Sequence, residues 1–364
     1  MTSNRIEEAR AALATVQDPD LHRDLVTLGM IEDLDVAGDR VTFTLVLTTA
    51  ACPLKAEIEA NCRQAVGALA WVKAVEIRPT SRVRKPRDPS ADRKPLEGVA
   101  NVLAIGSGKG GVGKSTVSCN LAVALAATGA RVGLLDADIY GPNLPRMLGV
   151  RRQPSQRDGK ILPVEAWGMQ FMSMGLLVEQ GEAVVWRGPM LHGAVKSFLH
   201  DVDWGELDYL LVDLPPGTGD VQLSLVQQTF VAGAVIVTKP SMVAIEDGVK
   251  AVSMFGKLQV PVLGVIENMS YFVCPDCHHR HDIFSSGDAE ARARSMGLEF
   301  LGAIPLHPQV RIGGDNGRPV VAEQPESEYA RCFTAIAGRL AQRVSILAAG
   351  GAAVPGPAGA AEAR

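Results

Sequence analysis

Cysteine and aromatic side chains are scarce in this chain of 364 residues, which has six cysteines and 5% Phe, Trp and Tyr. Six cysteines are too few for a disulfide scaffold of this length, so we expect free thiols or metal ligands. The chain also lacks a large excess of charge of either sign, because it has 36 Lys and Arg against 40 Asp and Glu, for a net charge of -4. We therefore expect no broad basic surface and no nucleic acid partner.

Long hydrophobic runs are missing as well. No apolar stretch approaches the roughly 18 residues of a membrane span, so we expect no membrane association. The first ten residues, MTSNRIEEAR, are charged where a signal peptide would be hydrophobic. The sequence therefore predicts a cytoplasmic protein.

The chain is rich enough in apolar residues, at 47%, to bury a sizeable core. Its length corresponds to about two domains of roughly 150 residues. The composition changes once, at 81–98, where SRVRKPRDPSADRKPLEG is basic and contains three prolines. We expect a small α+β domain over 1–80, a solvated linker over 81–98, a larger domain over 99–345 and a disordered, Ala- and Gly-rich tail over 346–364.

Each domain has its own pattern of apolar residues. In the small domain, this pattern predicts helices at 6–16 and 54–69 and strands at 41–47 and 72–77. The larger domain has short runs that are apolar throughout, typical of parallel strands buried on both faces. These runs are 102–107, 131–138, 209–215, 234–239 and 262–268. The fold class predicted for this domain is a doubly wound, mostly parallel α/β sheet.

A phosphate-binding loop follows the first of these runs and fits the pattern G-x-x-x-x-G-K-[ST]. Its glycines allow successive backbone N–H groups to face phosphate oxygens at the start of a helix. We expect Lys114 to neutralise the β- and γ-phosphates of ATP and Ser115 to bind Mg²⁺. The nucleotide-binding residues predicted here are Gly108, Lys109, Gly110, Gly111, Val112, Gly113, Lys114, Ser115 and Thr116.

Three aspartates stand at the ends of predicted strands, where open α/β sheets place ligand chemistry. Asp213 corresponds by position to a Walker B carboxylate that holds Mg²⁺ through water, and Asp136 is expected to support the magnesium shell. Asp138 is the candidate for orienting the water that attacks ATP. One of the two aspartates after 131–135 could instead cap the following turn.

The pair Cys274 and Cys277 lies in a predicted loop, within the sequence CPDCHHRH. Tetrahedral zinc and a [4Fe-4S] cluster both require four ligands, so the pair is half of a site. Three completions remain open: zinc bound with His278, His279 and His281; a redox dithiol; or a second copy of the chain that brings its own pair to a twofold axis.

Two resemblances bear on these alternatives. The segment KGGVGKS resembles the deviant P-loop ATPases, a group that includes the nitrogenase iron protein and the partition and septum-placement ATPases. This resemblance implies that Lys109 reaches the phosphates of a partner subunit in a nucleotide-sandwich dimer. It also implies that Asn268, which ends the run 262–268, binds adenine.

Residues 99–335 resemble the Mrp/ApbC family of iron-sulfur cluster carrier ATPases throughout. The resemblance rests on SGKGGVGKST, LLDADIYGPNLPRMLG, WRGPM, LLVDLPPGTGD, ENMSYFVCPDC and HDIF. It implies a homodimeric ATPase that binds a labile [4Fe-4S] cluster through Cys274 and Cys277, receives it from a scaffold and passes it to apo iron-sulfur client proteins. The segment FSSGDAE at 284–290 departs from the glycine-rich sequence usual in the family.

The N-terminal domain resembles a small domain of iron-sulfur assembly proteins, on the segments VQDPDLHRDLVTLGMI and LTTAACPLK. Cys52 is either a contact for a cluster or partner or a buried small hydrophobe. Cys62, Cys119 and Cys332 lie in helical apolar patterns and are expected in the core. Two other functions remain as alternatives: a positioning or regulatory ATPase of the partition type, and a zinc-stabilised nucleotide-binding scaffold.

Overall fold

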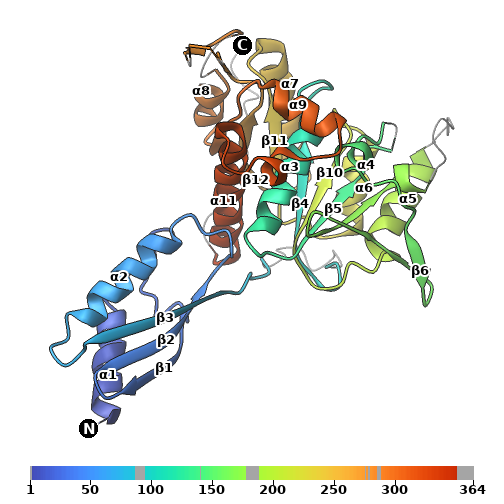
Figure 1. The fold of residues 1–364 in the computed structure, drawn as a ribbon. Helices are drawn as coiled ribbons and strands as arrows, with labels where there is room; N and C mark the ends of the chain where they lie inside the picture. The colour runs from blue at the N-terminus through green and yellow to red at the C-terminus, as the bar shows by residue number, and fades with distance from the viewer. Residues whose placement is uncertain are drawn as a thin grey trace. The chain divides into compact units, whose positions relative to one another are not determined.

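The computed structural model of the chain describes residues 2–86, 95–139, 141–177, 188–274, 276–277, 279–284 and 288–350. It divides into a small unit, Met1–Lys85 with Ala341–Ala352, and a large unit that includes Pro86–Leu340. Both are drawn in Figure 1. Residues 87–94 of the predicted linker and residues 351–364 of the predicted tail lie outside the described residues, so the domain boundaries remain predictions.

The small unit is an α+β fold, as expected. Its sheet has the order β1-β2-β3, with β1 antiparallel and β3 parallel to the central strand. Alternate residues of β2, Val41, Phe43 and Leu45, are buried against the helices. The elements are α1 (Thr2–Leu13), β1 (Ile31–Ala37), β2 (Arg40–Leu47), α2 (Lys55–Gly67) and β3 (Ala74–Ser81).

Strand β1 was not expected from the sequence. Its residues, IEDLDVA, include three acidic side chains, and most of them are exposed or half-buried. An irregularity in the register between Glu32 and Asp35 also breaks the alternation that identifies a strand. Pairing with β2, rather than local preference, therefore forms this edge strand.

The large unit is built on an eight-stranded sheet among the described residues, in the order β15-β12-β11-β4-β10-β5-β9-β8. Every neighbouring pair is parallel except β8 with β9. The predicted doubly wound, mostly parallel α/β sheet is confirmed. The strands are β4 (Val99–Gly106), β5 (Val132–Asp136), β8 (Val164–Ala166), β9 (Met169–Ser173), β10 (Leu207–Asp213), β11 (Gly233–Thr238), β12 (Val262–Glu267) and β15 (Phe300–Ala303).

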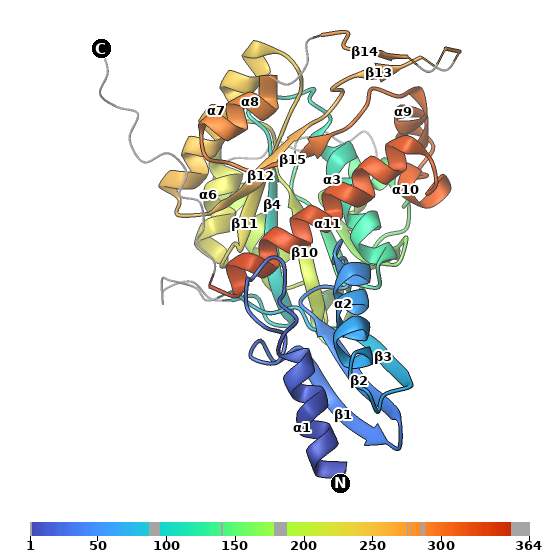
Figure 2. The ribbon, with the colours of Figure 1, turned by 90° about the vertical axis from the view of Figure 1, so that its left-hand side faces the viewer.

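Helices cover both faces of this sheet, which explains why its strands are apolar along their whole length (Figure 2). Helix α3 (Lys114–Ala127) packs on the strands from one face, with α4 (Leu144–Met147), α9 (Pro308–Asp315) and α10 (Val320–Glu323) beyond it. The other face carries α5 (Gly188–His200), α6 (Asp220–Gln228), α7 (Met242–Lys257) and α8 (Asp288–Ser295), which share one core with the strands.

Three smaller features complete the described chain. Strands β6 (Ser155–Arg157) and β7 (Lys160–Leu162) form one hairpin, and β13 (Phe272–Val273) and β14 (Arg280–His281) form another. The 3-10 helix η1 (Met174–Leu176) follows β9.

The last helix, α11 (Glu328–Ala348), includes the first residues that the sequence assigned to a disordered tail. Ile346 and Leu347 are half-buried, so they extend the apolar side of this helix rather than begin an unstructured segment. No helix among the described residues has the length and hydrophobicity that crossing a bilayer requires.

Candidate functional site

The phosphate-binding loop leaves the carboxyl end of β4 and leads into α3. Gly111 and Gly113 have φ angles of 76° and 79°, in the left-handed region that favours glycine. Gly108 has another requirement, because a Cβ atom there would lie 2.0 Å from the backbone carbon of Asp247 in α7. The glycines thus allow both the turn and the close packing of the loop against α7, while Val112 between them is buried.

The loop's lysine is paired with the aspartate at the end of β10. Lys114 Nζ lies 2.7 Å from Asp213 Oδ2, and the two residues are 6% and 0% exposed. Ser115 Oγ donates to the same carboxylate oxygen at 2.7 Å, and Ser118 Oγ donates to Asp213 Oδ1 at 2.5 Å. The sequence pattern did not single out Ser118, which follows Lys114 by one helical turn and therefore faces the same strand end.

Asp213 has a neighbour of like charge. Asp136, at the end of β5, is its register partner and is 1% exposed. Burial, and secondly the nearby Asp213 carboxylate, raise the pKa of Asp136 to about 8. Two buried carboxylates at one edge of the sheet are therefore held next to each other, and the charge of Lys114 acts on both.

Carboxylate and hydroxyl oxygens are the donors that Mg²⁺ prefers. Ser115, Asp136 and Asp213 bring such oxygens together at the carboxyl edge of the sheet, beside the phosphate-binding loop. The residues present therefore fit a magnesium–nucleotide complex.

The other predicted residues near the phosphate-binding loop, Asp138 and Lys109, are more accessible. Asp138 is half-buried, and its backbone N–H donates to Asp136 Oδ1 at 3.2 Å. Lys109 is half-buried too, and among the described residues its amine has no carboxylate within ion-pair distance.

The loop 215–219 after β10 is held by Gln222, whose side chain donates to the carbonyl oxygens of Pro215 and Gly217 at 2.9 and 3.0 Å. Gln222 was not anticipated from the sequence.

A cavity of about 340 Å³ opens beside the start of α3. Asn268 lies at its wall, 4% exposed, and its side chain donates to the carbonyl oxygen of Val112 at 2.9 Å. Asn268 is thus tied to the phosphate-binding loop rather than being a solvated turn residue. Thr116 lines the same cavity from α3, and α4 and α9 supply most of the opposite wall. The space adjoins the phosphate site and is large enough for part of a nucleotide.

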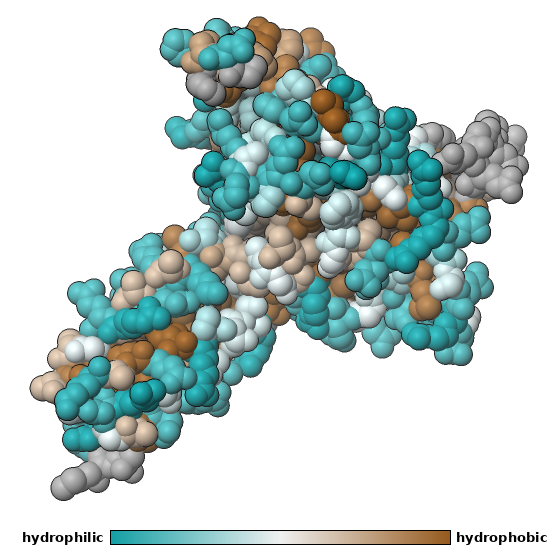
Figure 3. Space-filling model, in the orientation of Figure 1, coloured by the Kyte–Doolittle hydropathy of each residue, from teal (hydrophilic) through white to brown (hydrophobic). Residues whose placement is uncertain are grey.

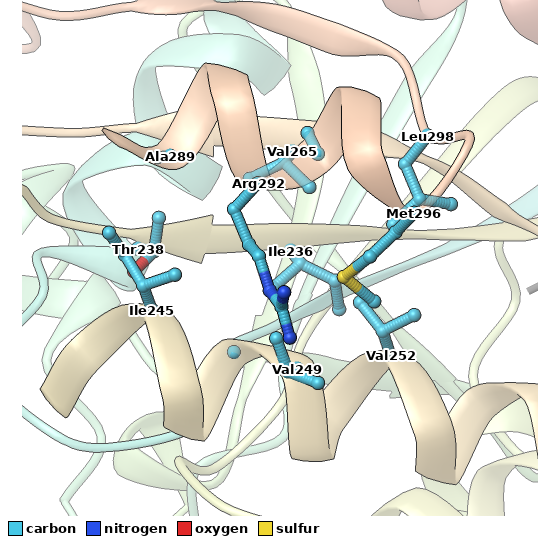
Figure 4. Close-up of a pocket in the computed structure, with 12 residues that line it drawn as sticks. Ile236, Thr238, Ile245, Val249, Val252, Val265, Ala289, Arg292, Met296 and Leu298 are labelled. Carbon is cyan, nitrogen blue, oxygen red and sulfur yellow. The ribbon is translucent and has the colours of Figure 1, made fainter. Parts of the chain in front are cut away.

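A second, much smaller cavity lies between α7 and α8 (Figure 4). Its volume is about 20 Å³, and its lining is almost entirely aliphatic, with Arg292 at one side. This is room for about one water molecule or methyl group. The cavity is therefore a local packing gap and not a substrate site.

The predicted metal-binding cysteines lie on the hairpin of β13 and β14. Cys274 N–H donates to the carbonyl oxygen of His279 at 3.0 Å, which closes the turn. The Cys274 side chain is half-buried and Cys277 is exposed. The backbone amides of Cys277 and Asp276 lower the pKa of the Cys274 thiol, which favours the thiolate that binds metal. No group of three or more potential metal ligands occurs among the described residues, although His278 lies outside them.

The other cysteines differ from one another. Cys62 and Cys119 are buried, and burial raises the pKa of both thiols, that of Cys62 to about 11. Cys332 is only half-buried and lies 3.9 Å from the hydroxyl of Tyr271. Cys52 is half-buried just before α2, and burial raises its pKa.

Comparisons with known proteins match both units of the chain. A family model described as the NUBPL iron-transfer P-loop NTPase matches residues 98–341, and a second, described as an iron-sulfur cluster assembly protein, matches residues 6–77. An iron-sulfur cluster carrier protein of Synechocystis sp. is 50% identical, over 92% of this chain and 97% of its own length. One of Deinococcus radiodurans is 52% identical, over 92% of this chain and 94% of its own.

Two solved structures have a similar large unit. A nucleotide-binding protein of Archaeoglobus fulgidus in complex with ADP is 38% identical, with a TM-score of 0.56 over 64% of this chain and 92% of its own. A septum site-determining protein of Pyrococcus horikoshii with Mg-ADP is 26% identical, with a TM-score of 0.51 over 65% and 94%. The chain belongs to the family of iron-sulfur cluster carriers built on an iron-transfer P-loop NTPase domain.

Proposed function

We propose that this chain hydrolyses ATP and carries a [4Fe-4S] cluster, which two copies hold between them and deliver to apo iron-sulfur proteins. The observation that carries the proposal is the cysteine hairpin. It presents two thiols, one with a lowered pKa, and no third potential ligand joins them among the described residues. A [4Fe-4S] cluster takes four thiolates. Cys274 and Cys277 of two copies supply that number.

Exposed apolar side chains support an interface at the same places. Hydrophilic residues cover most of the surface shown in Figure 3, and hydrophobic ones reach it in small patches. Ile283 and Phe284, directly after β14, are 54% and 59% exposed. Large apolar residues next to the proposed cluster ligands are what a partner surface would cover.

A second group of exposed apolar residues surrounds the phosphate-binding loop. Helices α6 and α7 follow β10 and β11, the two strands on either side of β4, so their first turns flank the loop. Leu223, Met242 and Val243 in these turns are 42%, 62% and 60% exposed. An interface that covers both groups would place the nucleotides and the cluster between the same two subunits.

The nucleotide half of the proposal assigns a task to each residue. Lys114 would exchange its ion pair with Asp213 for the phosphates, and Ser115 and Asp213 would hold Mg²⁺, which would neutralise charge on the transferred phosphoryl group. Asp136 supports the metal's water shell. Asn268 and the adjoining cavity take the base. Asp138 orients the attacking water, and Lys109 reaches the phosphates bound by the partner copy.

Release of the cluster follows from how it is held. A cofactor that depends on two residues from each subunit loses half of its ligands when the dimer opens. Nucleotides bound at the same interface would set how often it opens, so binding or hydrolysis of ATP can control delivery. The cytoplasm, where thiols stay reduced, is the compartment that suits such a site.

Anaerobic reconstitution with iron and sulfide, followed by size-exclusion chromatography, tests the proposal. We expect a dimer with about four iron and four sulfide ions per two chains. Four iron ions on a single chain would contradict sharing between copies. Stoichiometric zinc without sulfide in protein purified anaerobically would support the zinc-stabilised scaffold instead.

A further inference from the structure

Ser173 is a buried polar residue to which the sequence patterns assign no role. It ends β9, is 0% exposed, and its hydroxyl donates to Asp136 Oδ2 at 3.0 Å. The hydroxyl oxygen of Ser173 accepts a hydrogen bond from the backbone N–H of Gly175 in η1 at 3.1 Å. Both hydrogen-bonding functions of the hydroxyl are therefore used, and one of them is directed at a carboxylate of the nucleotide site.

The sheet places Ser173 in line with the two carboxylates. Asp213 of β10 is in register with Asp136 of β5, which is in register with Ser173 of β9. Residues in register across parallel strands project to the same side of a sheet. The three side chains thus form one row along the carboxyl edge.

The two carboxylates of this row are held differently. Asp213 is bound by three side chains of α3, those of Lys114, Ser115 and Ser118. Asp136 has one side-chain donor among the described residues, Ser173, and one backbone donor, the N–H of Asp138. Loss of the Ser173 hydroxyl would leave Oδ2 of Asp136 without its side-chain donor, so that the N–H of Asp138 alone would orient the carboxylate.

We propose that Ser173 is a positioning residue of the magnesium–nucleotide site, acting through Asp136. By fixing Oδ2, it holds the Asp136 carboxylate beside Asp213 and keeps Oδ1 on the N–H of Asp138, so that Asp136 would be in place to support a bound magnesium ion. Ser173 thereby sets the position of the residue that orients the attacking water. The inference rests on the proposed use of Mg-ATP, but not on the cluster.

The test measures metal binding apart from catalysis. Mn²⁺ serves as a probe for Mg²⁺, and its free concentration is followed by electron paramagnetic resonance in the presence of saturating ADP. Residues that orient metal ligands typically change affinity about 10- to 100-fold when removed. We expect Ser173→Ala to weaken Mn²⁺ binding about tenfold and to leave the affinity for metal-free ADP within about twofold of wild type.

Two further variants separate positioning from general damage. Ser173→Cys keeps nearly the same size but is a weak donor, so it should behave like Ser173→Ala. Ser224→Ala is the matched control. Ser224 of α6 is also buried, at 5% exposure, but its hydroxyl hydrogen-bonds to His192 of α5 instead of to a residue of the nucleotide site. It should bind Mn²⁺ as wild type does.

The outcomes are distinguishable. Unchanged Mn²⁺ binding in Ser173→Ala or in Ser173→Cys overturns the inference, and so does an equal loss in Ser224→Ala. If the wild-type chain itself shows no Mn²⁺ binding with ADP, the proposed nucleotide function fails, whatever the variants do. A steady-state assay of ATP hydrolysis gives a second measurement. Ser173→Ala should hydrolyse ATP more slowly than wild type, and a higher Mg²⁺ concentration should partly restore the rate, which it would not do for a misfolded variant.

Discussion

The nucleotide site and the cysteine hairpin are opposite kinds of construction within the large unit. Around Asp213, the side chains of Lys114, Ser115 and Ser118 lie 2.5–2.7 Å from its carboxylate oxygens, and Asp136 is buried beside it. Around Cys274, the structure offers a turn between two strands of two residues each, with Cys277 exposed. In the first region the polar groups are paired within a single chain, whereas in the second no third potential metal ligand joins the two thiols among the described residues.

This difference accords with what each region would do. A site that binds and hydrolyses a nucleotide gains from fixed groups, because catalysis of phosphoryl transfer depends on positioning and charge stabilisation. A site that must give up its cargo gains from ligands that are accessible and shared. The variants below separate the two regions, beginning with the largest expected effect.

Removal of one thiol should abolish the cluster and spare the nucleotide site. We expect Cys274→Ala to retain less than about a tenth of the reconstituted iron, because both copies lose a thiol and the two remaining thiolates of a shared set of four leave two irons without their protein ligand. ATP affinity should stay within about twofold, since the hairpin supplies none of the residues around Asp213. Iron analysis and binding of a fluorescent nucleotide measure the two effects. Cys62→Ala is the control, because its buried thiol should be irrelevant to iron.

The converse variant should slow hydrolysis and spare the cluster. Asp138→Ala removes the candidate for orienting water, while Lys114 and Asp213 remain in place. We expect the turnover number to fall about 100-fold, within the range for loss of a positioned group, and ATP binding to change little. Steady-state ATPase assays with bound-iron analysis check this result. Unchanged turnover would remove Asp138 from the mechanism.

The alkylation rates of the Cys274 and Cys62 thiols should depend differently on pH. The thiolate is the reactive form, so a thiol with a lowered pKa reacts at a lower pH. In metal-free protein, alkylation of Cys274 by iodoacetamide should reach half of its maximal rate below pH 9.0, the ordinary value. Cys62, with a pKa of about 11, should react only at higher pH. Mass spectrometry of each peptide across pH measures both, and a Cys274 midpoint above 9 would contradict the backbone-amide explanation.

The sequence predicts the nucleotide site better than the hairpin for a physical reason. A phosphate-binding loop is a local device, so glycines and Lys114 identify it within nine residues. The doubly wound sheet follows from runs of apolar residues, whose carboxyl ends bring Asp136 and Asp213 to one edge. Ser173 and Gln222 could not be found this way, because their roles depend on contacts across strands and around a loop.

Parts of the fold also escaped prediction for identifiable reasons. The acidic strand β1 has no apolar alternation, so its pairing with β2 could not be read from composition. Cys332 was expected in the core from its helical pattern, yet it is only half-buried beside Tyr271. A helical apolar pattern indicates which side of a helix is covered, but not how completely a neighbouring loop covers it.

The smallest expected effect concerns the packing gap between α7, which contacts the phosphate-binding loop, and α8, which follows the cysteine hairpin in the chain. Gly248 of α7 lines this gap, and a Cβ there would lie 3.8 Å from Ile236 Cγ2 and 4.0 Å from Thr238 Oγ1, at ordinary contact distance. Gly248→Ala should therefore raise the free energy of unfolding by about 1–2 kcal/mol, from helix propensity and a buried methyl group. Calorimetric melting measures the change.

A second glycine of the same helix isolates the contribution of the gap. A Cβ at Gly256 would meet no atom within 4 Å, so Gly256→Ala gains helix propensity without filling the gap. It should stabilise the protein by less than about 1 kcal/mol. Because a Cβ at Gly248 would meet no atom of the phosphate-binding loop within 4 Å, ATP hydrolysis should not change in either variant. Equal stabilisation by both would show that the gap is already closed in solution and that the contact between α7 and α8 is as tightly packed as the site around Asp213.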